Sequence, residues 1–514
     1  MSDHGAANAW RVLVAAALLG TDRAPFTPPA AEGPLGAALA RLDPADPPSA
    51  LLDAAAVLDA YREAGRLPPR DDSAPSPPSD PDETPVAPAA ARELLAGMCE
   101  GQYPNLISEW LSLAAQRGFR APAALLPDLL DYGLAEPEER QPMVLAVIGE
   151  RGRWLAAQNP KWRYAAPLPP DAETIWRTGD RATRLAILHA VRRADPGRAR
   201  AIIEATWGED RADERAVFIA ALESGLSMDD EPFLESALDD RSASVRTAAA
   251  ALLAELPGSR LAARMAARAR PLIAFDAGTC TLSVTPPVPD DALRRDGMIA
   301  PPRNWAHDEA SWLLQGVVAC APPGMWVTAL ETTPKALIEA AQGGEHESVL
   351  LPAWQRAALR AGDVAWLQAL VEAGLMRRAA PQLTAALDVD ARERMALWSL
   401  SRLQRAGLPL TGDVFTLDFL IHCRHPWGAA LTRAVLKALH EQGQRGSVPA
   451  TGTQGALREV AAHLSPALMP EAEAVLNQSL GARVDPGWRR AIEGMIEVLH
   501  VRRRLHEAFA QGSS

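Results

Sequence analysis

The sequence predicts an all-α protein, an α-solenoid of stacked helical hairpins with one small β-hairpin near the middle. From Ala89 onward, helix-length amphipathic segments recur roughly every 12 to 20 residues, separated by Pro, Gly or Asp. The connections are short, which is typical of antiparallel helices that pack side by side. Between Met228 and Leu256, two short helices flank an acidic turn, and such a unit buries its apolar side only against neighbouring units.

Residues 1–66 are predicted to form an N-terminal helical segment. One helix is expected over Asn8–Gly20, because Gly commonly ends a helix. A second is expected over Pro48–Gly65, whose leucines and alanines recur at helical spacing. The intervening stretch Pro25–Pro47, rich in Pro, Ala and Gly, is predicted to be irregular.

Residues 67–88 are predicted to be a disordered linker. Pro, Ser and Asp dominate this stretch, so it has too few apolar side chains to offset the entropy lost on ordering. A plain tether is the main interpretation. A proline-rich, acidic binding motif is the alternative.

Residues 89–270 are predicted to be helical repeats. Turn and capping residues mark the helix starts, as at Asp180 and at Asp195–Pro196. The expected helices are Asn105–Gln116, Pro122–Tyr132, Glu138–Ala157, Asp180–Arg193, Gly197–Trp207, Asp213–Ser224, Glu231–Leu238 and Ser242–Leu256.

The helix that follows Asp240 carries the clearest repeat pattern. Val245, Ala249, Leu252 and Leu256 lie three or four residues apart and so share one face. This segment resembles the second helix of a HEAT repeat. The resemblance implies that the turn aspartate faces an arginine of a neighbouring unit.

Residues 271–300 are predicted to form a β-hairpin joint between two helical halves. Leu272–Phe275 and Cys280–Thr285 alternate apolar and polar residues around Asp276, Ala277 and Gly278. Residues 301–514 are predicted to be C-terminal helical repeats that end in a long capping helix. The expected helices are Trp305–Ala321, Lys335–Ala341, Ser348–Ala361, Val364–Ala373, Ala379–Leu387, Ala391–Gln404, Thr416–Cys423, Gly428–Gln442, Leu457–Leu464, Glu471–Leu480 and Pro486–Gln511.

Composition narrows the class of protein. The 514 residues carry 52 basic and 64 acidic side chains, a net charge of −12, which disfavours non-specific binding to nucleic acid or anionic membrane. The four cysteines are scattered, so neither a disulfide framework nor a structural zinc site is expected. Because no secretory pattern and no membrane-length apolar run is found, a cytoplasmic location is expected.

Motifs for chemistry are missing from the sequence. It contains no phosphate-binding loop, no GxGxxG after a predicted strand, no GxSxG and no HExxH. The run His422–His425 holds two His and one Cys, but adjacent positions point to different sides of a helix, so a structural or surface role is preferred to metal binding. The sequence therefore predicts no enzyme activity, no catalytic residue, no metal and no cofactor.

Two groups of residues are candidates for binding a partner. Arg260, Arg264 and Arg268 lie four residues apart on one helical stripe, which could recognise an acidic protein segment or phosphates. The structural alternative is that acids of adjacent repeats, such as Asp239 and Asp240, neutralise this stripe.

Arg151, Arg153 and Trp154 form the second group, because Arg and Trp often anchor interfaces. Packing of Trp154 against the next helix pair is the structural alternative for this group.

Several phrases together resemble an uncharacterised bacterial family of HEAT-like helical proteins. They are ALLGTDR at Ala17–Arg23, LLDAAAVLDAYREAG at Leu51–Gly65, VIGERGRWLAAQNPKW at Val147–Trp162, TWGEDRADERAVFIAAL at Thr206–Leu222, DEPFLESALDDRSASVR at Asp230–Arg246 and LSVTPP at Leu282–Pro287. Members of that family are typically encoded beside a MoxR-type AAA ATPase, a von Willebrand A-domain protein and a SWIM zinc-finger protein. The resemblance implies a non-enzymatic part of an ATPase-driven system and supplies no catalytic residues.

These observations favour a protein-interaction scaffold or adaptor that works with the MoxR-type AAA ATPase and the von Willebrand A-domain protein. The SWIM zinc-finger protein is a further expected partner. The alternative function is a HEAT-like DNA-binding or alkylated-base repair protein, in which the stripe of Arg260, Arg264 and Arg268 would line the DNA groove. The acidic net charge makes nucleic acid the less favoured partner.

Overall fold

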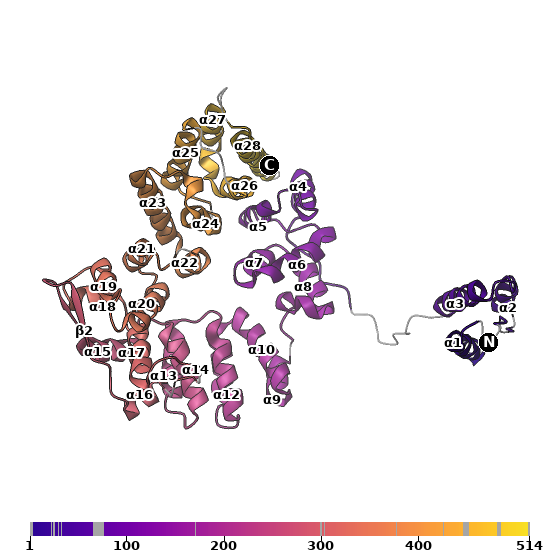
Figure 1. Cartoon of the computed structure of the whole chain (residues 1–514), viewed down its shortest axis with the longest axis horizontal. Coiled ribbons are helices and arrows are strands. Elements are labelled where there is room, and N and C mark those ends of the chain that lie inside the picture. The colour runs from indigo at the N-terminus through magenta and orange to yellow at the C-terminus, as the bar shows by residue number, and fades with distance from the viewer. Residues whose placement is uncertain are drawn as a thin grey trace. The chain divides into compact units, whose positions relative to one another are not determined.

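The computed structural model describes residues 4–21, 23, 26–28, 30–31, 33–64, 77–169, 171–298, 301–302, 304–376, 378–424, 426–445, 452–480 and 485–511 (Figure 1). The chain divides into two compact units, Met1–Pro78 and Ser79–Ser514. Helices dominate both, and the strands in the described residues form a single two-stranded hairpin. The predicted all-α fold is confirmed.

The first unit contains three helices, α1 (His4–Leu19), α2 (Gly33–Leu39) and α3 (Pro47–Ala64). α1 and α2 both pack on α3, and their buried side chains form a small core of their own. The helices predicted over Asn8–Gly20 and Pro48–Gly65 are confirmed. The prediction of an irregular stretch up to Pro47 missed α2, because Leu35 and Leu39 are drawn into this core despite the neighbouring glycines.

The predicted linker 67–88 lies partly outside and partly within the described residues. Residues 65–76 lie outside the described residues. The following stretch, instead of being a free tether, lies against the second unit, where Val86 forms a parallel β-bridge with Arg120. The Asp82 carboxylate accepts a hydrogen bond from the backbone N–H of Glu150. The composition of this stretch predicted disorder, because it has few apolar side chains. Its tertiary contacts offset the entropy that is lost when the stretch becomes ordered.

The second unit begins with helices that largely match the predicted series. They are α4 (Ala89–Cys99), α5 (Ile107–Gln116), α6 (Leu126–Ala135), α7 (Pro137–Leu145), α8 (Gly149–Gln158), α9 (Ala172–Thr178), α10 (Arg181–Ala194), α11 (Pro196–Thr206), α12 (Ala212–Ala220), α13 (Glu231–Ala237), α14 (Ala243–Ala254), α15 (Arg260–Ala269) and α16 (Asp291–Arg295). Asp180 and Asp195 cap α10 and α11 as predicted, each accepting a backbone N–H of the first turn.

The long helix predicted over Glu138–Ala157 was wrong, since it is divided into α7 and α8 at Gly149. Gly149 has a φ of +62°, in the left-handed region that favours glycine. A Cβ there would lie 2.2 Å from Oδ1 of Asp82. The break between the two helices thus also holds the segment that leads into the second unit.

We predict that Gly149→Ala weakens this attachment. The backbone strain and the displaced Asp82 hydrogen bond together should cost about 2–4 kcal/mol of unfolding free energy. Gly118→Ala is the matched control, because Gly118 has a φ of +71° but nothing within 4 Å of an added Cβ. Limited proteolysis should cut residues 79–88 faster in Gly149→Ala than in Gly118→Ala. Equal rates would contradict the role assigned to Gly149.

The predicted β-hairpin is confirmed. β1 (Ile273–Asp276) and β2 (Thr281–Val284) pair antiparallel, with Ile273 opposite Val284 and Asp276 opposite Thr281. β2 contacts the helix α19 (Pro334–Ala341), so the hairpin lies on the helices that follow it.

The remaining helices form two layers. Their bounds are α17 (Glu309–Cys320), α18 (Gly324–Ala329), α20 (Glu347–Ala361), α21 (Val364–Glu372), α22 (Ala380–Ala386), α23 (Val389–Ala406), α24 (Val414–His422), α25 (Ala429–Gln444), α26 (Thr453–His463), α27 (Met469–Gln478) and α28 (Pro486–Gln511). From α19 onward the helices pack beside the next but one, in the series α20, α22, α24, α26 and α28 and the series α19, α21, α23, α25 and α27, whereas α17 packs on α15 and α20. This alternation is the arrangement expected of stacked helical hairpins.

Buried arginine–aspartate pairs join successive hairpins. The carboxylate of Asp240, in the turn before α14, lies 3.0 Å from the guanidinium of Arg215 on α12. This is the neighbouring-unit arginine that the resemblance to a HEAT repeat implied. Arg184 on α10 and Asp210 form an equivalent pair at 2.8 Å.

The last helix returns to the first helices of the second unit. α28 contacts α4 and α5, so the two ends of the helical array meet (Figure 1). Trp110 on α5 and Phe509 on α28 meet edge to face, with ring centroids 5.5 Å apart. α28 therefore joins the ends of the array, where a terminal cap had been predicted. In the described residues, no helix combines the length and apolar character needed to cross a membrane.

Candidate functional site

The predicted arginine stripe lies on α15, and its guanidinium groups hold carboxylates of neighbouring helices. Arg260 binds Glu231 through two hydrogen bonds of 2.8 and 3.0 Å. Arg264 and Arg268 both bind Asp296, at 2.8 and 2.6 Å. Asp296 is 1% exposed, so these arginines compensate a buried charge and join α15 to the end of α16.

The acids named in the structural alternative bind other arginines. Asp239 pairs with Arg295 at 2.6 Å, and Asp240 pairs with Arg215. Carboxylates of neighbouring elements do neutralise the arginine stripe, but they are Glu231 and Asp296 and not the predicted Asp239 and Asp240. A role in partner binding stays a prediction for Arg260, Arg264 and Arg268, of which Arg260, at 60%, has the most exposed side chain.

The second predicted group lies on α8. Arg151 is exposed, Arg153 forms an ion pair with Glu150 at 2.8 Å on the same helix, and Trp154 is half-buried. Trp162, just beyond α8, donates its indole N–H to Asp131 at 2.7 Å. The group thus combines an exposed cation with a partly covered ring.

The members of the His422–His425 cluster, at the end of α24, have different environments. His422 is bound to the carbonyl of Asp418 through Nδ1 at 2.8 Å. Cys423 is buried, and burial raises the pKa of its thiol to about 12, which disfavours the thiolate. His425 lies outside the described residues. In the part of the chain that the structure describes, no three His, Cys, Asp or Glu side chains are grouped to hold a metal ion.

A cavity of about 560 Å³ lies where the two ends of the array meet, and we call it the junction cavity. Its lining comes from α5, α6 and α7 on one side and from Arg424, α26 and α28 on the other. A second hollow, of about 580 Å³, adjoins it and shares Glu139 and Arg424 with it. Segments far apart in the sequence thus contribute side chains to one space.

Glu109 joins the two sides at the base of the junction cavity. Arg502, whose side chain is fully buried, donates to it from Nε at 2.7 Å and from Nη2 at 2.9 Å. His506 Nε2 lies 2.9 Å from the same carboxylate. Burial alone would raise the pKa of Glu109, but the hydrogen bonds from His506 and Arg502 outweigh it and lower that pKa.

A second group of charges surrounds Arg424, which also lines the cavity. The guanidinium of Arg424 binds Glu136, the residue that precedes α7, and lies 3.8 Å from the carboxylate of Glu139 on α7. Glu459 on α26 is half-buried and also interacts electrostatically with Arg424. Arg424 thus pairs with two carboxylates and attracts a third.

An aromatic and apolar wall completes the cavity. The Arg140 guanidinium lies 4.2 Å from the centre of the Tyr132 ring and also bonds Glu136 at 2.9 Å. The Tyr132 hydroxyl is hydrogen-bonded to Ser108 at 2.7 Å. The apolar lining consists of Pro104, Ile107, Leu113, Met143, Pro426, Ala462 and Pro466.

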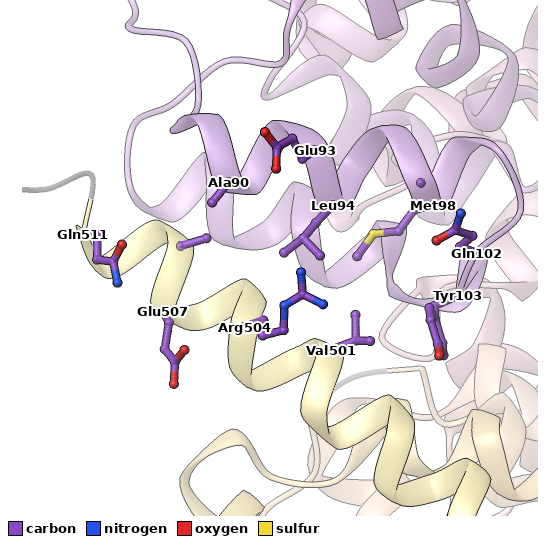
Figure 2. Close-up of a pocket in the computed structure, with 12 residues that line it drawn as sticks. Ala90, Glu93, Leu94, Met98, Gln102, Tyr103, Val501, Arg504, Glu507 and Gln511 are labelled. Carbon is purple, nitrogen blue, oxygen red and sulfur yellow. The ribbon is translucent and has the colours of Figure 1, made fainter.

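A separate groove of about 360 Å³ runs between α4 and α28 (Figure 2). Leu94 and Met98 on α4 face Val501 and Arg504 on α28, and Glu507 points away from α4 (Figure 2). This groove is open and shallow, and its apolar contacts serve the packing of the two helices.

The first unit carries a different feature, an apolar outer face on α1. Leu13 is buried in the small core, whereas Leu18 is 82% exposed and Leu19 is 61% exposed. Val12 and Val14 are also exposed, and Arg11 is the only Arg, Lys, Asp or Glu in the helix. A helix that is apolar all round normally has both faces covered.

The sequence matches the family of unknown function DUF5691 over residues 12–509. The chain belongs to this family. The DUF5691 match includes parts of both units and most of α28, so it covers the helices that line the junction cavity. No curated protein and no solved structure matches the chain.

Sequence reasoning missed the junction cavity of this DUF5691 protein. Glu109 and Arg502 are 393 residues apart, and neither lies in a recognisable motif. Arg424 belonged to the His422–His425 cluster, which drew attention for its possible metal ligands and not for its arginine. That cluster was the one signal in the sequence that pointed to this region.

Proposed function

We propose that this protein is a non-enzymatic interaction scaffold or adaptor that works with a MoxR-type AAA ATPase and a von Willebrand A-domain protein. The observation that carries the proposal is the apolar outer face of α1. Leu18 and Leu19 present large aliphatic side chains to solvent on a helix that already buries its other face. Large aliphatic side chains that are exposed together on one helix are typical of protein interaction sites.

The arrangement of the chain supports this function. The α1 face belongs to a small unit with its own core, and the chain between residues 65 and 76 is rich in Pro, Ser and Asp. A small unit that belongs to the same chain as a large helical unit suits an adaptor, because the covalent connection raises the effective concentration of one bound partner near another. The choice of the ATPase system rests on the family resemblance described above.

The DNA-binding alternative draws less support. It depended on Arg260, Arg264 and Arg268, and these side chains hold Glu231 and Asp296 within the fold. Binding a phosphate backbone there would require those buried or half-buried carboxylates to be left uncompensated.

We predict that Leu18→Glu weakens association with the partner by about tenfold or more, since a buried carboxylate would replace an apolar contact. The measurement is isothermal titration of the full-length protein with purified MoxR-type ATPase and with the A-domain protein, each without nucleotide, with ADP and with ATP. Val288→Glu is the matched control, because Val288 is 80% exposed in the second unit.

Two results would overturn the proposal. One is the absence of association with either protein in every nucleotide state. The other is equal affinity of the wild type and the Leu18→Glu variant, which would place the interaction away from α1.

A further inference from the structure

The junction cavity has the size and lining of a binding site for a small ligand. Its volume is about 560 Å³, within the range usual for ligand pockets. Apolar side chains such as Ile107 and Met143 line part of it, and charged side chains line the rest. Such a site suits a ligand with an aliphatic body and a charged end.

The carboxylates near Arg424 outnumber the guanidinium groups that pair with them. Arg424 is shared among Glu136, Glu139 and Glu459, and the closest approach to Glu139 is 3.8 Å. Arg140 already bonds Glu136 and lies over the Tyr132 ring. Two guanidinium groups, those of Arg140 and Arg424, thus compensate three carboxylates. Glu109 is paired separately with Arg502.

The titration behaviour of two of these acids agrees with that imbalance. Burial is the largest cause that raises the pKa of Glu139, and the attraction of Arg424 does not fully offset it. Burial likewise raises the pKa of Glu459 against the attraction of Arg424 and a hydrogen bond from Asn105. Each carboxylate would be stabilised in its ionised form by an additional cation.

We propose that the junction cavity binds an organic cation, an ammonium or guanidinium group on an aliphatic stem, with Glu139 and Glu459 holding the charged end from opposite walls. The stem would lie along Ile107, Leu113 and Met143. Glu139 is on α7 and Glu459 is on α26, so the bound cation bridges the two ends of the array.

An anion fits this space less well. The two guanidinium groups that line the cavity already hold carboxylates, so an incoming phosphate or carboxylate would have to displace Glu136. A cation, by contrast, adds the charge that the three acids lack.

The same cationic chemistry has two sources, a free polyamine or a Lys or Arg side chain of a protein segment. Titration calorimetry of the full-length protein would therefore use two probes, spermidine and a capped Ala-Arg-Ala peptide. Mg²⁺ and 1,4-butanediol serve as references for charge alone and for an aliphatic chain alone.

Glu139→Gln and Glu459→Gln are the test variants. Each keeps the shape of the side chain and removes its charge, so each should weaken binding of the active probe by about tenfold. Glu507→Gln is the matched control, because Glu507 lies on α28 in the separate groove and points away from α4 (Figure 2). Circular dichroism would show that the variants keep the helical fold.

Binding should also release protons near the raised pKa values. The titratable or charged groups that line this space are Glu109, Tyr132, Glu139, Arg140, Arg424, Glu459, His463 and His506. Glu136 lines the adjoining hollow and is paired with Arg140 and Arg424. Because the cation favours the ionised forms of Glu139 and Glu459, whose pKa values burial raises, titration at acidic pH in buffers of different ionisation enthalpy should show proton release that is lost in the two Gln variants.

The outcomes separate the possibilities. Spermidine binding that is weakened by both variants supports the proposal with a free amine, and binding of the peptide alone supports it with a protein side chain. Binding of neither probe above the Mg²⁺ reference overturns the proposal, as does unchanged binding in both Gln variants. Neither of these results bears on the α1 interaction, which is tested separately.

Discussion

Replacing Arg192 with Met is expected to cost about 3–5 kcal/mol of unfolding free energy, since it leaves a buried carboxylate without its main partner. The Arg192 side chain has no exposed surface, and its guanidinium binds both carboxylate oxygens of Asp230, at 2.9 and 2.7 Å. Its remaining N–H groups donate to four backbone carbonyls, those of Pro196, Leu222, Ser224 and Gly225. Urea unfolding followed by circular dichroism would measure the loss.

Arg181→Met is the matched control for this prediction. Arg181 lies on the same helix, α10, and its ion pair with Asp213 is exposed, with side-chain exposures of 48% and 66%. The control should lose less than about 1 kcal/mol. Losses of similar size in both variants would contradict the importance of burial at Arg192.

Acid should affect the same pair. Burial alone would raise the pKa of Asp230, but hydrogen bonds from Arg192 and from the backbone of Ser227 lower it below its ordinary 3.8. The ionised carboxylate therefore contributes stability above its ordinary pKa, and that stability is lost as the pH falls through the lowered value. In Arg192→Met the decline should begin at a higher pH.

Replacing Arg502 with Met is expected to separate the two ends of the helical array. Arg502 bonds Glu109 twice and donates to the carbonyls of Ala461 and Leu464 at 3.0 and 2.7 Å. Because the Arg502 side chain is fully buried, the loss should again be about 3–5 kcal/mol. Hydrogen exchange should speed up in α4 and α28 more than in α13 and α14, which lie outside this contact.

Arg503→Met provides the neighbouring control. Arg503 pairs with Glu473 on the exposed side of α28, where its own side chain is 48% exposed. Its loss should leave exchange in α4 unchanged. Faster exchange spread evenly over the second unit in Arg502→Met would contradict a local role in joining the ends.

Local features of the sequence predicted most of the helices and the hairpin. Asp180 and Asp195 mark helix starts within a few residues, and helical spacing of apolar residues marks the faces that become buried. The pairing of the two hairpin strands was predicted from alternation around a short turn, and the structure adds the register, with Ile273 opposite Val284. These signals are local, so one sequence is enough to read them.

The junction cavity could not be predicted in the same way. The contact of Arg424 with Glu136 spans 288 residues, and that of Arg502 with Glu109 spans 393. No local period encodes which distant turn an arginine will reach. The same limit explains the arginine stripe, because the sequence showed that Arg264 and Arg268 needed acids but not that Asp296 would supply them.

The contact between α28 and α5 also has a consequence for folding during synthesis on the ribosome. Arg502 follows Glu109 by 393 residues, which at about 5–20 residues per second means a delay of roughly 20–80 s on the ribosome. During that interval Trp110 has no Phe509 to pack against. The earliest helices of the second unit therefore keep an incompletely packed surface until the final helix emerges.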